Sequence, residues 1–314
     1  MDIQEEIKQD VNLAELTTFK IGGAAKFMIK VKSKEELKAA YLWAKEKKEK
    51  VFIFAGGSNV LVNDQGVDGL VIKVDNDDVI ARSERIDCGA GASLAQAVRL
   101  AATNHLTGLE WAAGIPGSVG GATRGNAGAF GSSMAETVET VEAFSIEKKI
   151  FELFSKNDSE FSYRSSIFKE KNSYLIWRVI LKLIKGETTK IDKLINDNLN
   201  HRNNTQPKLP SAGSIFKNIK LEEIKTNNQE LAKYAQVEGK VRDNKVAAGW
   251  LIELVGAKGK AIGGAKVSLE HANFIINTGR ATSEDVIMLI SFIKQQVRNR
   301  FKIQLQEEVQ YLGF

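Results

Sequence analysis

Residues 112–131, AAGIPGSVGGATRGNAGAFG, constrain this chain more than any other part of its sequence. Seven of these residues are glycine, at positions 114, 117, 120, 121, 125, 128 and 131, and one is among the chain's three prolines. Every glycine adds backbone entropy that folding must overcome, so this density argues against a helix or a strand. A flexible linker would hold more serine and charge, and it would not be edged by Trp111 and Phe130. We therefore expect an ordered loop that runs close against a flat or anionic ligand and exposes its N–H groups; a purely structural loop is the alternative.

Length and charge exclude several classes of protein. A chain of 314 residues is long for a single core, which predicts two or three domains. Its 44 Lys and Arg against 39 Asp and Glu give a net charge of +5, which suits an acidic small ligand such as a nucleotide. Nucleic-acid binding requires a concentrated basic stripe with aromatic residues in it, whereas the basic residues here are scattered. We therefore expect small-molecule ligands, no nucleic acid and no obligate protein partner.

The cysteine, the histidines and the apolar runs limit the chemistry and the compartment. Cys88 is the only cysteine and there are three histidines, so the sequence predicts neither a disulfide framework nor a metal site. The first ten residues, MDIQEEIKQD, are acidic and polar, unlike a secretory signal, and no apolar run approaches the length of a membrane span. We therefore expect a cytoplasmic protein without a membrane partner.

Alternating strand and helix patterns predict an α+β chain. Residues 1–76 form a first α+β unit, and a second unit follows it. A polar helix over residues 186–206 that runs into a linker marks the boundary of a third unit. In the third unit we expect a mostly helical, charged segment over 219–246, a strand over 262–267, a long helix over 283–301 and partly alternating residues over 303–312.

A second glycine-rich loop, Gly56-Gly57-Ser58-Asn59, joins two predicted strands. Such a bend gathers backbone N–H groups and a hydroxyl as phosphate-binding nests do, although a plain hairpin loop would look similar. The sequence GAG at 89–91 is similar to a dinucleotide fingerprint, but residue 94 is leucine and no βαβ pattern surrounds it, so we exclude a Rossmann site. Together the two glycine-rich loops fit one large ligand with a diphosphate and a flat ring system, such as flavin adenine dinucleotide (FAD); two tight structural turns are the alternative.

Four further polar residues stand in settings that suit a binding or catalytic role. Arg164 offers a rigid guanidinium fork to a carboxylate or phosphate, or it forms a surface ion pair. Ser214 follows a glycine and precedes Lys217, so it is either a polarised hydroxyl or a turn-forming serine. The sequence has no Gly-x-Ser-x-Gly elbow, which argues against a hydrolase. Two interpretations stay open for Glu308, a catalytic residue or an exposed strand residue. Two also stay open for His271, a residue that contacts a ligand or a partly buried histidine without that role.

At these residues the chain resembles the UDP-N-acetylenolpyruvoylglucosamine reductase (UDP-N-acetylmuramate dehydrogenase) family. The matching segments occur in the family's order over nearly the whole chain, and the long glycine-rich run is the most specific of them. They are residues 18–23 (TFKIGG), 56–62 (GGSNVLV), 108–110 (GLE), 112–131, 163–164 (YR), 212–218 (AGSIFKN), 261–267 (AIGGAKV) and 305–309 (LQEEV).

The resemblance implies a two-subdomain FAD-binding fold of the vanillyl-alcohol-oxidase type over residues 1–200, with subdomains at about 1–76 and 77–200. A C-terminal α+β substrate domain over 201–314 follows, with a return of the last strand to the FAD-binding domain as a variant. The resemblance also implies non-covalently bound FAD, NADPH as reductant, and reduction of UDP-N-acetylglucosamine enolpyruvate to UDP-N-acetylmuramate for peptidoglycan synthesis.

The family's functional residues carry over by position. Ser214 matches the proton donor that acts on C2 after hydride transfer from FAD to C3, and Arg164 and Glu308 match the residues that flank the enolpyruvyl group. The substrate-binding residues implied are Lys217 and Asn218, close to the diphosphate, with Tyr163 and His271. The flavin-binding residues implied are Gly56, Gly57, Ser58, Asn59, Val60, Gly114, Ile115, Pro116, Gly117, Ser118, Gly120, Gly121, Asn126 and Gly128.

The chain departs from the family pattern in two places. The interval between Arg164 and Ser214 is short, so the chain resembles the shorter form of the family, which lacks an inserted substrate-covering loop with a tyrosine. Residues 219–246 are longer and more charged than the family pattern, which leaves the covering of the substrate cleft open. Two other functions would keep the same loops: another flavin oxidoreductase of this fold, and a non-catalytic nucleotide-sugar-binding protein.

Overall fold

The computed structural model describes residues 3–314, and the chain forms two compact units. Unit 1 contains the described residues up to Val11 together with Ala25–Gly57 and Asp68–Asn204. Unit 2 contains Asn12–Ala24, Ser58–Val67 and Thr205–Phe314. Both units mix helices and strands, which confirms the predicted α+β class. Among the described residues, no helix is both long enough and apolar enough to span a bilayer.

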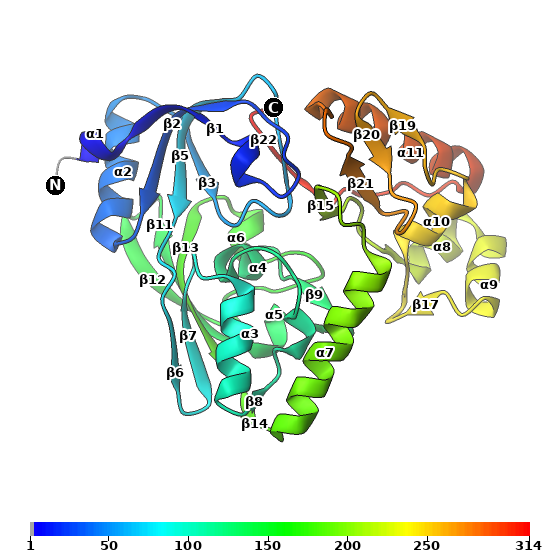
Figure 1. Cartoon of the computed structure of the whole chain (residues 1–314), viewed down its shortest axis with the longest axis horizontal. Coiled ribbons are helices and arrows are strands. Elements are labelled where there is room, and N and C mark those ends of the chain that lie inside the picture. Colours follow the sequence, from blue (N-terminus) through cyan, green and yellow to red (C-terminus); the bar gives the residue numbers. More distant parts are fainter. Residues whose placement is uncertain (1–2) are drawn as a thin grey trace. The chain divides into compact units, whose positions relative to one another are not determined.

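The first part of unit 1 is a four-stranded sheet with helix α2 packed on it (Figure 1). The strands, in spatial order, are β1 (Lys8–Asn12), β2 (Ala24–Val31), β5 (Val67–Val74) and β3 (Val51–Phe54). Helix α2 (Lys34–Glu46) begins after Ser33, whose hydroxyl accepts a hydrogen bond from the Glu36 N–H at 3.1 Å. Its apolar face is buried against the sheet because apolar residues recur at helical spacing, at Leu37, Ala40, Tyr41 and Ala44. The short helix α1 (Ile3–Glu6) contacts α2.

The second part of unit 1 is an antiparallel five-stranded sheet with two helices against it (Figure 1). The strands, in spatial order, are β12 (Ile150–Ser155), β11 (Val138–Ser145), β13 (Tyr174–Lys182), β7 (Arg85–Gly89) and β6 (Val79–Arg82). Helix α3 (Leu94–Thr103) contacts β6 and β7, and helix α4 (Val119–Arg124) contacts β13. The other elements of this part are β8 (Leu106–Thr107), the 3₁₀ helix η2 (Glu110–Ala112), β9 (Gly128–Ala129), β10 (Ser132–Ser133), α5 (Met134–Thr137), α6 (Ile167–Glu170), β14 (Ile184–Lys185) and α7 (Thr188–Thr205).

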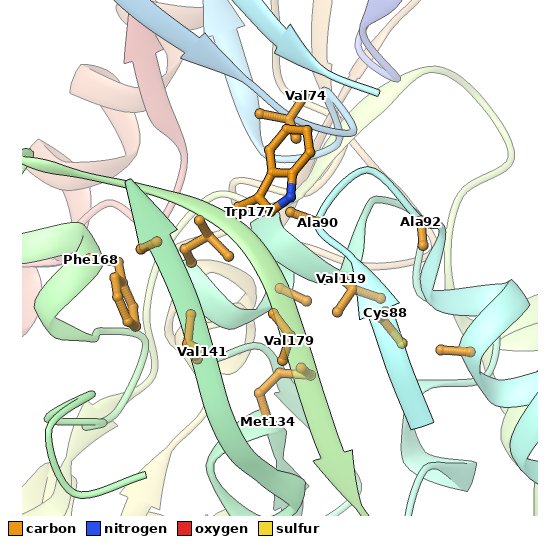
Figure 2. Close-up of a cluster of buried hydrophobic side chains, with 14 of the residues drawn as sticks. Val74, Cys88, Ala90, Ala92, Val119, Met134, Val141, Phe168, Trp177 and Val179 are labelled. Atoms are coloured by element: carbon orange, nitrogen blue, oxygen red, sulfur yellow. The ribbon is translucent and has the colours of Figure 1, made fainter. Parts of the chain in front are cut away.

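Figure 2 shows part of the hydrophobic core of unit 1. Side chains from three strands of the large sheet, Cys88, Val141 and Val179, gather in one cluster with Val119 of α4 and Met134 of α5. All five are buried. Because α4 belongs to the glycine-rich stretch, this stretch is anchored directly on the core.

Unit 2 is built on a four-stranded antiparallel sheet. The strands, in spatial order, are β15 (Ser211–Ser214), β21 (Phe274–Asn277), β20 (Ala265–Val267) and β19 (Ala261–Ile262). Helix α11 (Ser283–Phe301) contacts β19 and β20. A smaller sheet has the order β16 (Ile219–Lys220), β18 (Lys245–Val246) and β17 (Val241–Arg242). The other helices of unit 2 are η1 (Ala14–Leu16), α8 (Leu221–Asn227), α9 (Gln229–Val237) and α10 (Ala248–Leu254).

The last strand completes unit 2 by pairing with a strand from early in the chain. Strand β22 (Gln310–Leu312) runs parallel to β4 (Val60–Val62). The core of unit 2 likewise combines Phe19, Ile21 and Leu61 with apolar residues of the C-terminal part. Two short segments from the first seventy residues are therefore part of the C-terminal unit.

Two expectations about local structure are wrong. Residues 119–124 form helix α4 inside the stretch that was expected to hold neither helix nor strand. The expected strand over 262–267 is a hairpin, because the chain turns at Gly263, whose φ is +51°, between β19 and β20. Residues 219–246 were expected to be mostly helical, and they do contain helices α8 and α9, with three short strands in addition.

Candidate active site

The glycine-rich stretch of unit 1 is bonded to the turn that precedes α3. The Val119 N–H donates to the Ala92 carbonyl oxygen at 2.8 Å, and the Gly120 N–H donates to the Ala90 carbonyl oxygen at 2.9 Å. A Cβ on Gly120 would lie 2.7 Å from the Ala90 Cβ, closer than side chains pack. Ahead of α4 the backbone turns at Gly117, whose φ of +116° favours glycine. Close backbone approach and tight turning therefore both require glycine here.

The second glycine-rich loop touches the first one within unit 1. A Cβ on Gly56 would lie 2.6 Å from the Gly117 Cα and 2.7 Å from the Ser118 backbone nitrogen. Two loops far apart in the sequence thus lie backbone to backbone, with no side chain between them. Such a surface suits a flat ring or a diphosphate, which can approach the backbone N–H groups. The residues present therefore fit a flavin dinucleotide.

Three of the predicted flavin-binding residues also have a structural part in these loops. The buried Ser118 caps α4, because its hydroxyl accepts a hydrogen bond from the Gly121 N–H at 3.2 Å. Gly57 has a φ of +63°. A Cβ on Gly128 would lie 2.6 Å from the Ser132 carbonyl oxygen across the β9–β10 hairpin. A flavin contact by these residues stays a prediction.

The loop that carries Tyr163 and Arg164 is tied to the glycine-rich stretch. The Asn126 side chain donates to the Ser162 carbonyl oxygen at 2.8 Å. The Ser166 hydroxyl donates to the Arg124 carbonyl oxygen at 2.7 Å. The structure therefore brings this predicted substrate loop next to the predicted flavin-binding residues of unit 1.

Arg164 occupies a strained position in a tight turn. The Ser162 N–H donates to the Ser165 carbonyl oxygen at 3.0 Å, and the Ser165 N–H donates back to the Ser162 carbonyl oxygen at 3.1 Å. Arg164 is the third residue of this turn and has a φ of +56°, which costs a residue with a side chain about 1 kcal/mol or more. Its guanidinium carbon lies 5.6 Å from the centre of the Tyr163 ring. Strain of this kind concentrates at functional sites, so it supports a role for Arg164.

Sequence analysis missed Arg202, which lies in α7. Its Nε donates to the Ala113 carbonyl oxygen at 2.9 Å, and its guanidinium carbon lies 5.2 Å from the centre of the Phe130 ring. A Cβ on Gly114 would lie 2.9 Å from the Arg202 Cδ, so this arginine packs directly on the loop. Burial lowers the pKa of Arg202, and the positive charge of Arg164 lowers it further. No local motif marks Arg202 in the sequence, because its partners come from segments about 70 to 90 residues earlier.

In unit 2, the backbone of Ser214 is fixed at the end of β15. Ser214 pairs with Phe274 of β21, and the pairing is irregular just before it, where Gly213 has a φ of +76°. Immediately after it, the Ile215 N–H donates to the Asn273 carbonyl oxygen at 2.8 Å. The glycine that precedes Ser214 in the sequence is therefore needed for the turn that positions the serine.

Glu308 lies beside the same segment of unit 2. The Glu308 N–H donates to the Ile215 carbonyl oxygen at 2.7 Å, and the Asn59 side chain donates to the Glu308 carbonyl oxygen at 3.2 Å. The structure therefore brings Ser214, Glu308 and Asn59 together. Asn59 Oδ1 is buried and accepts no hydrogen bond within the described part of the chain, so it can accept one from a ligand.

The predicted diphosphate residues follow Ser214 along the chain. Lys217 is half-buried, and its N–H donates to the Gln306 carbonyl oxygen at 2.8 Å. Asn218 is exposed, and its Oδ1 accepts from the Ala248 N–H at 3.3 Å. Contact of either residue with a diphosphate stays a prediction.

His271 packs beside the strand that pairs with Ser214. Its ring centre lies 4.7 Å from that of Phe274. Its Nδ1 accepts a hydrogen bond from the Asn273 N–H at 3.2 Å, so the neutral imidazole carries its proton on Nε2. His271 therefore presents a donor rather than an acceptor on its other nitrogen.

The remaining predicted flavin-binding residues lie in both units. Ile115 packs against the core of unit 1, and Pro116 is exposed. In unit 2, the Ser58 carbonyl oxygen accepts from the Thr18 hydroxyl at 3.4 Å, and Val60 begins β4. Over residues 3–314, no three His, Cys, Asp or Glu side chains are grouped so that they could hold a metal ion.

Two family models match the chain. The model described as "FAD binding domain" matches residues 25–148, and the model described as "UDP-N-acetylenolpyruvoylglucosamine reductase, C-terminal domain" matches residues 206–312. The first match spans both glycine-rich loops and confirms the predicted FAD-binding fold.

Curated relatives and a solved structure match nearly the full length. The UDP-N-acetylenolpyruvoylglucosamine reductase of Solibacter usitatus is 39% identical over 302 residues, covering 96% of this chain and 95% of the relative. That of Caldanaerobacter subterraneus subsp. tengcongensis is 38% identical over 299 residues, covering 95% and 90%. The crystal structure of UDP-N-acetylenolpyruvylglucosamine reductase from Thermus caldophilus matches with a TM-score of 0.76 and 31% identity, over 98% of each chain.

Proposed function

Because this chain belongs to the UDP-N-acetylenolpyruvoylglucosamine reductase family, we propose that it reduces UDP-N-acetylglucosamine enolpyruvate to UDP-N-acetylmuramate, a peptidoglycan precursor, with NADPH as reductant and non-covalent FAD. The observation that carries this proposal is the contact between the two glycine-rich loops of unit 1, where Gly56 meets Gly117 and Ser118 without a side chain between them.

The residues that would hold FAD are those of the two loops. Within residues 114–121, Pro116 has no N–H, and the N–H groups of Ile115, Val119, Gly120 and Gly121 are bonded within the protein. Gly56, Gly57, Gly114, Gly117 and Ser118 are therefore the residues that would turn backbone N–H groups to the diphosphate. When bound, FAD would supply the hydride chemistry that links NADPH oxidation to reduction of the enol ether at C3. The chain's own residues must then bind the carboxylate, stabilise the charge that develops on it and supply a proton.

Arg164 and Glu308 are the residues that we assign to the carboxylate. An isolated vinyl ether resists hydride addition, so the adjacent carboxylate must take up negative charge as an enediolate. The rigid fork of Arg164 suits two carboxylate oxygens, and the turn that strains its backbone also limits its freedom. Arg202 adds a second positive charge near Arg164. Glu308, when protonated, donates a further hydrogen bond to the same group.

Ser214 is the residue that we assign to protonation of C2. A serine hydroxyl is a weak acid near neutral pH, but the enediolate is strongly basic, so the proton transfer runs downhill. Lys217, three residues further on, stabilises the alkoxide that remains. The main-chain bonds on both sides of Ile215 hold the neighbouring Ser214 in place, as a positioned proton donor requires.

Anaerobic stopped-flow absorbance of the flavin tests this proposal. We expect yellow protein that NADPH alone bleaches and that UDP-N-acetylglucosamine enolpyruvate alone then restores. Recovery with simple alcohols or related substrates in its place would indicate another flavin oxidoreductase. A colourless protein that binds the UDP-sugar and cannot be loaded with flavin would indicate a nucleotide-sugar-binding protein and would overturn the proposal.

A further inference from the structure

Residues 219–246 place three cations side by side on a small sheet. In the pairing of β16, β18 and β17, Lys220 lies directly opposite Lys245, and Lys245 lies directly opposite Arg242. These strands belong to the part of unit 2 that contains α8 and α9, where β17 is labelled in Figure 1. We call Lys220, Lys245 and Arg242 the cationic row.

The other face of this sheet explains why the cations cannot turn inward. In the same register, Ile219 pairs with Val246, and Val246 pairs with Val241. Ile219 and Val246 are buried in the core of unit 2, and Val241 packs against it. Because side chains alternate between the faces of a strand, burial of this apolar row points the cationic row away from the core.

Mutual repulsion disfavours such a row, although the Lys245 ammonium donates a hydrogen bond to the Asp243 carbonyl oxygen at 3.2 Å. Directly opposed residues have Cβ atoms roughly 5 Å apart, and like charges at that position destabilise a sheet. Lys220 and Arg242 are exposed, and no carboxylate in the described part of the chain lies within ion-pair distance of either. By contrast, Lys225 in the adjacent α8 is paired with Glu222 at 2.7 Å. Three clustered cations that repel one another suit a multiply charged anion.

The position of the cationic row identifies the kind of anion. Lys220 follows Asn218 by two residues, which span at most about 7 Å of chain. The Asn218 side chain is bonded to the Ala248 N–H, two residues beyond the end of β18. The cationic row therefore continues from Asn218, which the family resemblance implies to lie close to the substrate diphosphate together with Lys217.

We propose that the cationic row binds a phosphate group of a nucleotide ligand of this enzyme, an inference that rests on the proposed function. The two sources of such a group are the nicotinamide dinucleotide and the diphosphate of the UDP-sugar. Three cations on a fixed strand scaffold would hold the negatively charged oxygens by charge-assisted hydrogen bonds, whether these are the two charges of a 2′-phosphate or the two shared by the phosphates of a diphosphate.

The test uses the variant Lys220→Gln/Arg242→Gln, with Lys225→Gln/Lys233→Gln as the matched control in the same segment. Dissociation constants for UDP and for 2′,5′-ADP are measured by calorimetry, and that for the UDP-sugar by titration of the oxidised flavin's absorbance. Those for NADPH and NADH come from the concentration dependence of the flavin reduction rate in anaerobic stopped flow. We expect roughly tenfold or greater weakening in the first variant at low salt, a smaller effect at high salt, and no change in the control. Removal of repelling charges also predicts that the first variant melts no lower than the wild type.

The pattern of weakening distinguishes the sources. Weaker 2′,5′-ADP and NADPH with unchanged NADH assigns the row to the 2′-phosphate, and weaker UDP and UDP-sugar assigns it to the substrate diphosphate. Equal weakening of NADPH and NADH assigns it to the dinucleotide diphosphate. Unchanged binding of every ligand, or the same loss in the control, overturns the proposal. If the wild-type flavin responds to neither NADPH nor the UDP-sugar, the proposed function fails instead, whereas the calorimetry with UDP and 2′,5′-ADP still tests the row.

Discussion

Ser214 is positioned by main-chain contacts that do not involve its hydroxyl. It pairs with Phe274, and the next residue, Ile215, is bonded to Asn273 on one side and to Glu308 on the other. Replacement of the serine by alanine therefore removes a hydroxyl from a backbone that stays in place. The effect of this replacement on the reaction therefore reports the chemical role of the hydroxyl and not a change in the backbone.

The Ser214→Ala variant tests that separation. We expect NADPH to bleach the flavin at nearly the wild-type rate, and reoxidation by the enolpyruvyl substrate to slow by about 10²-fold or more, because only the second step needs the proton. Anaerobic stopped-flow absorbance measures both steps. Lys208→Ala, at an exposed residue shortly before the same strand, is the control and should leave both rates unchanged. An equal loss in both steps for Ser214→Ala would show that the serine is structural.

Gly56 is a residue at which the two glycine-rich loops pack closely against each other. A methyl group there would meet the backbone of Gly117 and Ser118, which cannot move without shifting the whole loop. We expect Gly56→Ala to lose flavin on gel filtration and to lower the free energy of unfolding by about 1–3 kcal/mol. Flavin absorbance per protein and urea unfolding measure the two effects.

Gly125 provides the matched control in the same stretch. A Cβ there would lie 3.6 Å from its nearest neighbour, the Gly121 carbonyl oxygen, which is an ordinary contact. Its φ of −87° also suits alanine. We expect Gly125→Ala to keep its flavin and to be as stable as the wild type or slightly more so. Full flavin retention by Gly56→Ala would contradict the assignment of this contact to the cofactor.

The sequence predicts which loops are special but not what each residue in them does. The glycine density of residues 112–131 predicts an ordered segment whose backbone is approached closely, either by a ligand or by other parts of the protein. It does not predict that Ala90 leaves no room for a side chain at position 120. It also does not predict that the Asn126 side chain is hydrogen-bonded to Ser162, in the loop that carries Arg164. Those contacts join distant parts of the chain, and no local pattern records them.

Among the secondary-structure elements, α4 and α11 show the limits of local prediction. Helix α11 has the predicted bounds, because its apolar period and its capping box of Thr282 and Asp285 are both local signals. Helix α4 contains two glycines that disfavour a helix, yet bonds from Val119 and Gly120 to the turn before α3 stabilise it. Tertiary contacts therefore override propensity in α4 and agree with it in α11.

Asp285 joins α11 to the β19–β20 hairpin and gives a prediction for stability. Its carboxylate accepts hydrogen bonds from the Gly264 N–H at 2.9 Å and the Thr282 N–H at 3.1 Å. The bond from Gly264 is the main cause that lowers the pKa of Asp285 below its usual value. We expect Asp285→Ala to reduce the free energy of unfolding at pH 7 by about 1–2 kcal/mol. Urea unfolding at a series of pH values measures this loss.

The sign of the pH dependence follows from the lowered pKa. The charged carboxylate is stabilised in the folded state, so its contribution is complete above the usual aspartate pKa of about 4 and is lost as pH falls through the lowered value. The difference between wild type and Asp285→Ala should therefore shrink below about pH 4. Glu284→Ala, an exposed neighbour in the same turn, should show a much smaller difference. A gap for Asp285→Ala that stays constant down to pH 2 would show that the charge is not responsible.

For the molecule as a whole, chain order is a poor guide to which residues fold together. Residues 12–24 and 58–67 lie between segments of unit 1 in the sequence, but they belong to unit 2. The pairing of β22 with β4 joins residues about 250 positions apart. Sequence analysis divides the chain at successive linkers, and pairings of this length leave no periodic signal at either end.

Cys88 can report when unit 1 unfolds. It is fully buried in the core shown in Figure 2. Burial raises the pKa of its thiol to about 12, with a smaller contribution from Asp87. The thiolate is the reactive form, and an exposed thiol has a pKa of about 8.5, so the folded protein should resist a disulfide reagent at pH 8 while the unfolded chain reacts fully.

Because Cys88 is the only cysteine, thiol labelling reports the exposure of one site in unit 1. Tryptophan fluorescence provides a second, independent measure of unfolding. Trp43, Trp111 and Trp177 lie in unit 1, and Trp250 lies in unit 2. In a Trp250→Phe variant, we expect the urea midpoint for labelling to coincide with that for tryptophan fluorescence, because both then report unit 1. Labelling in the absence of urea at a rate above that of unfolding would mean that β7 opens locally. That result would contradict a core in which the thiol is closed off by the large sheet and the anchored glycine-rich stretch.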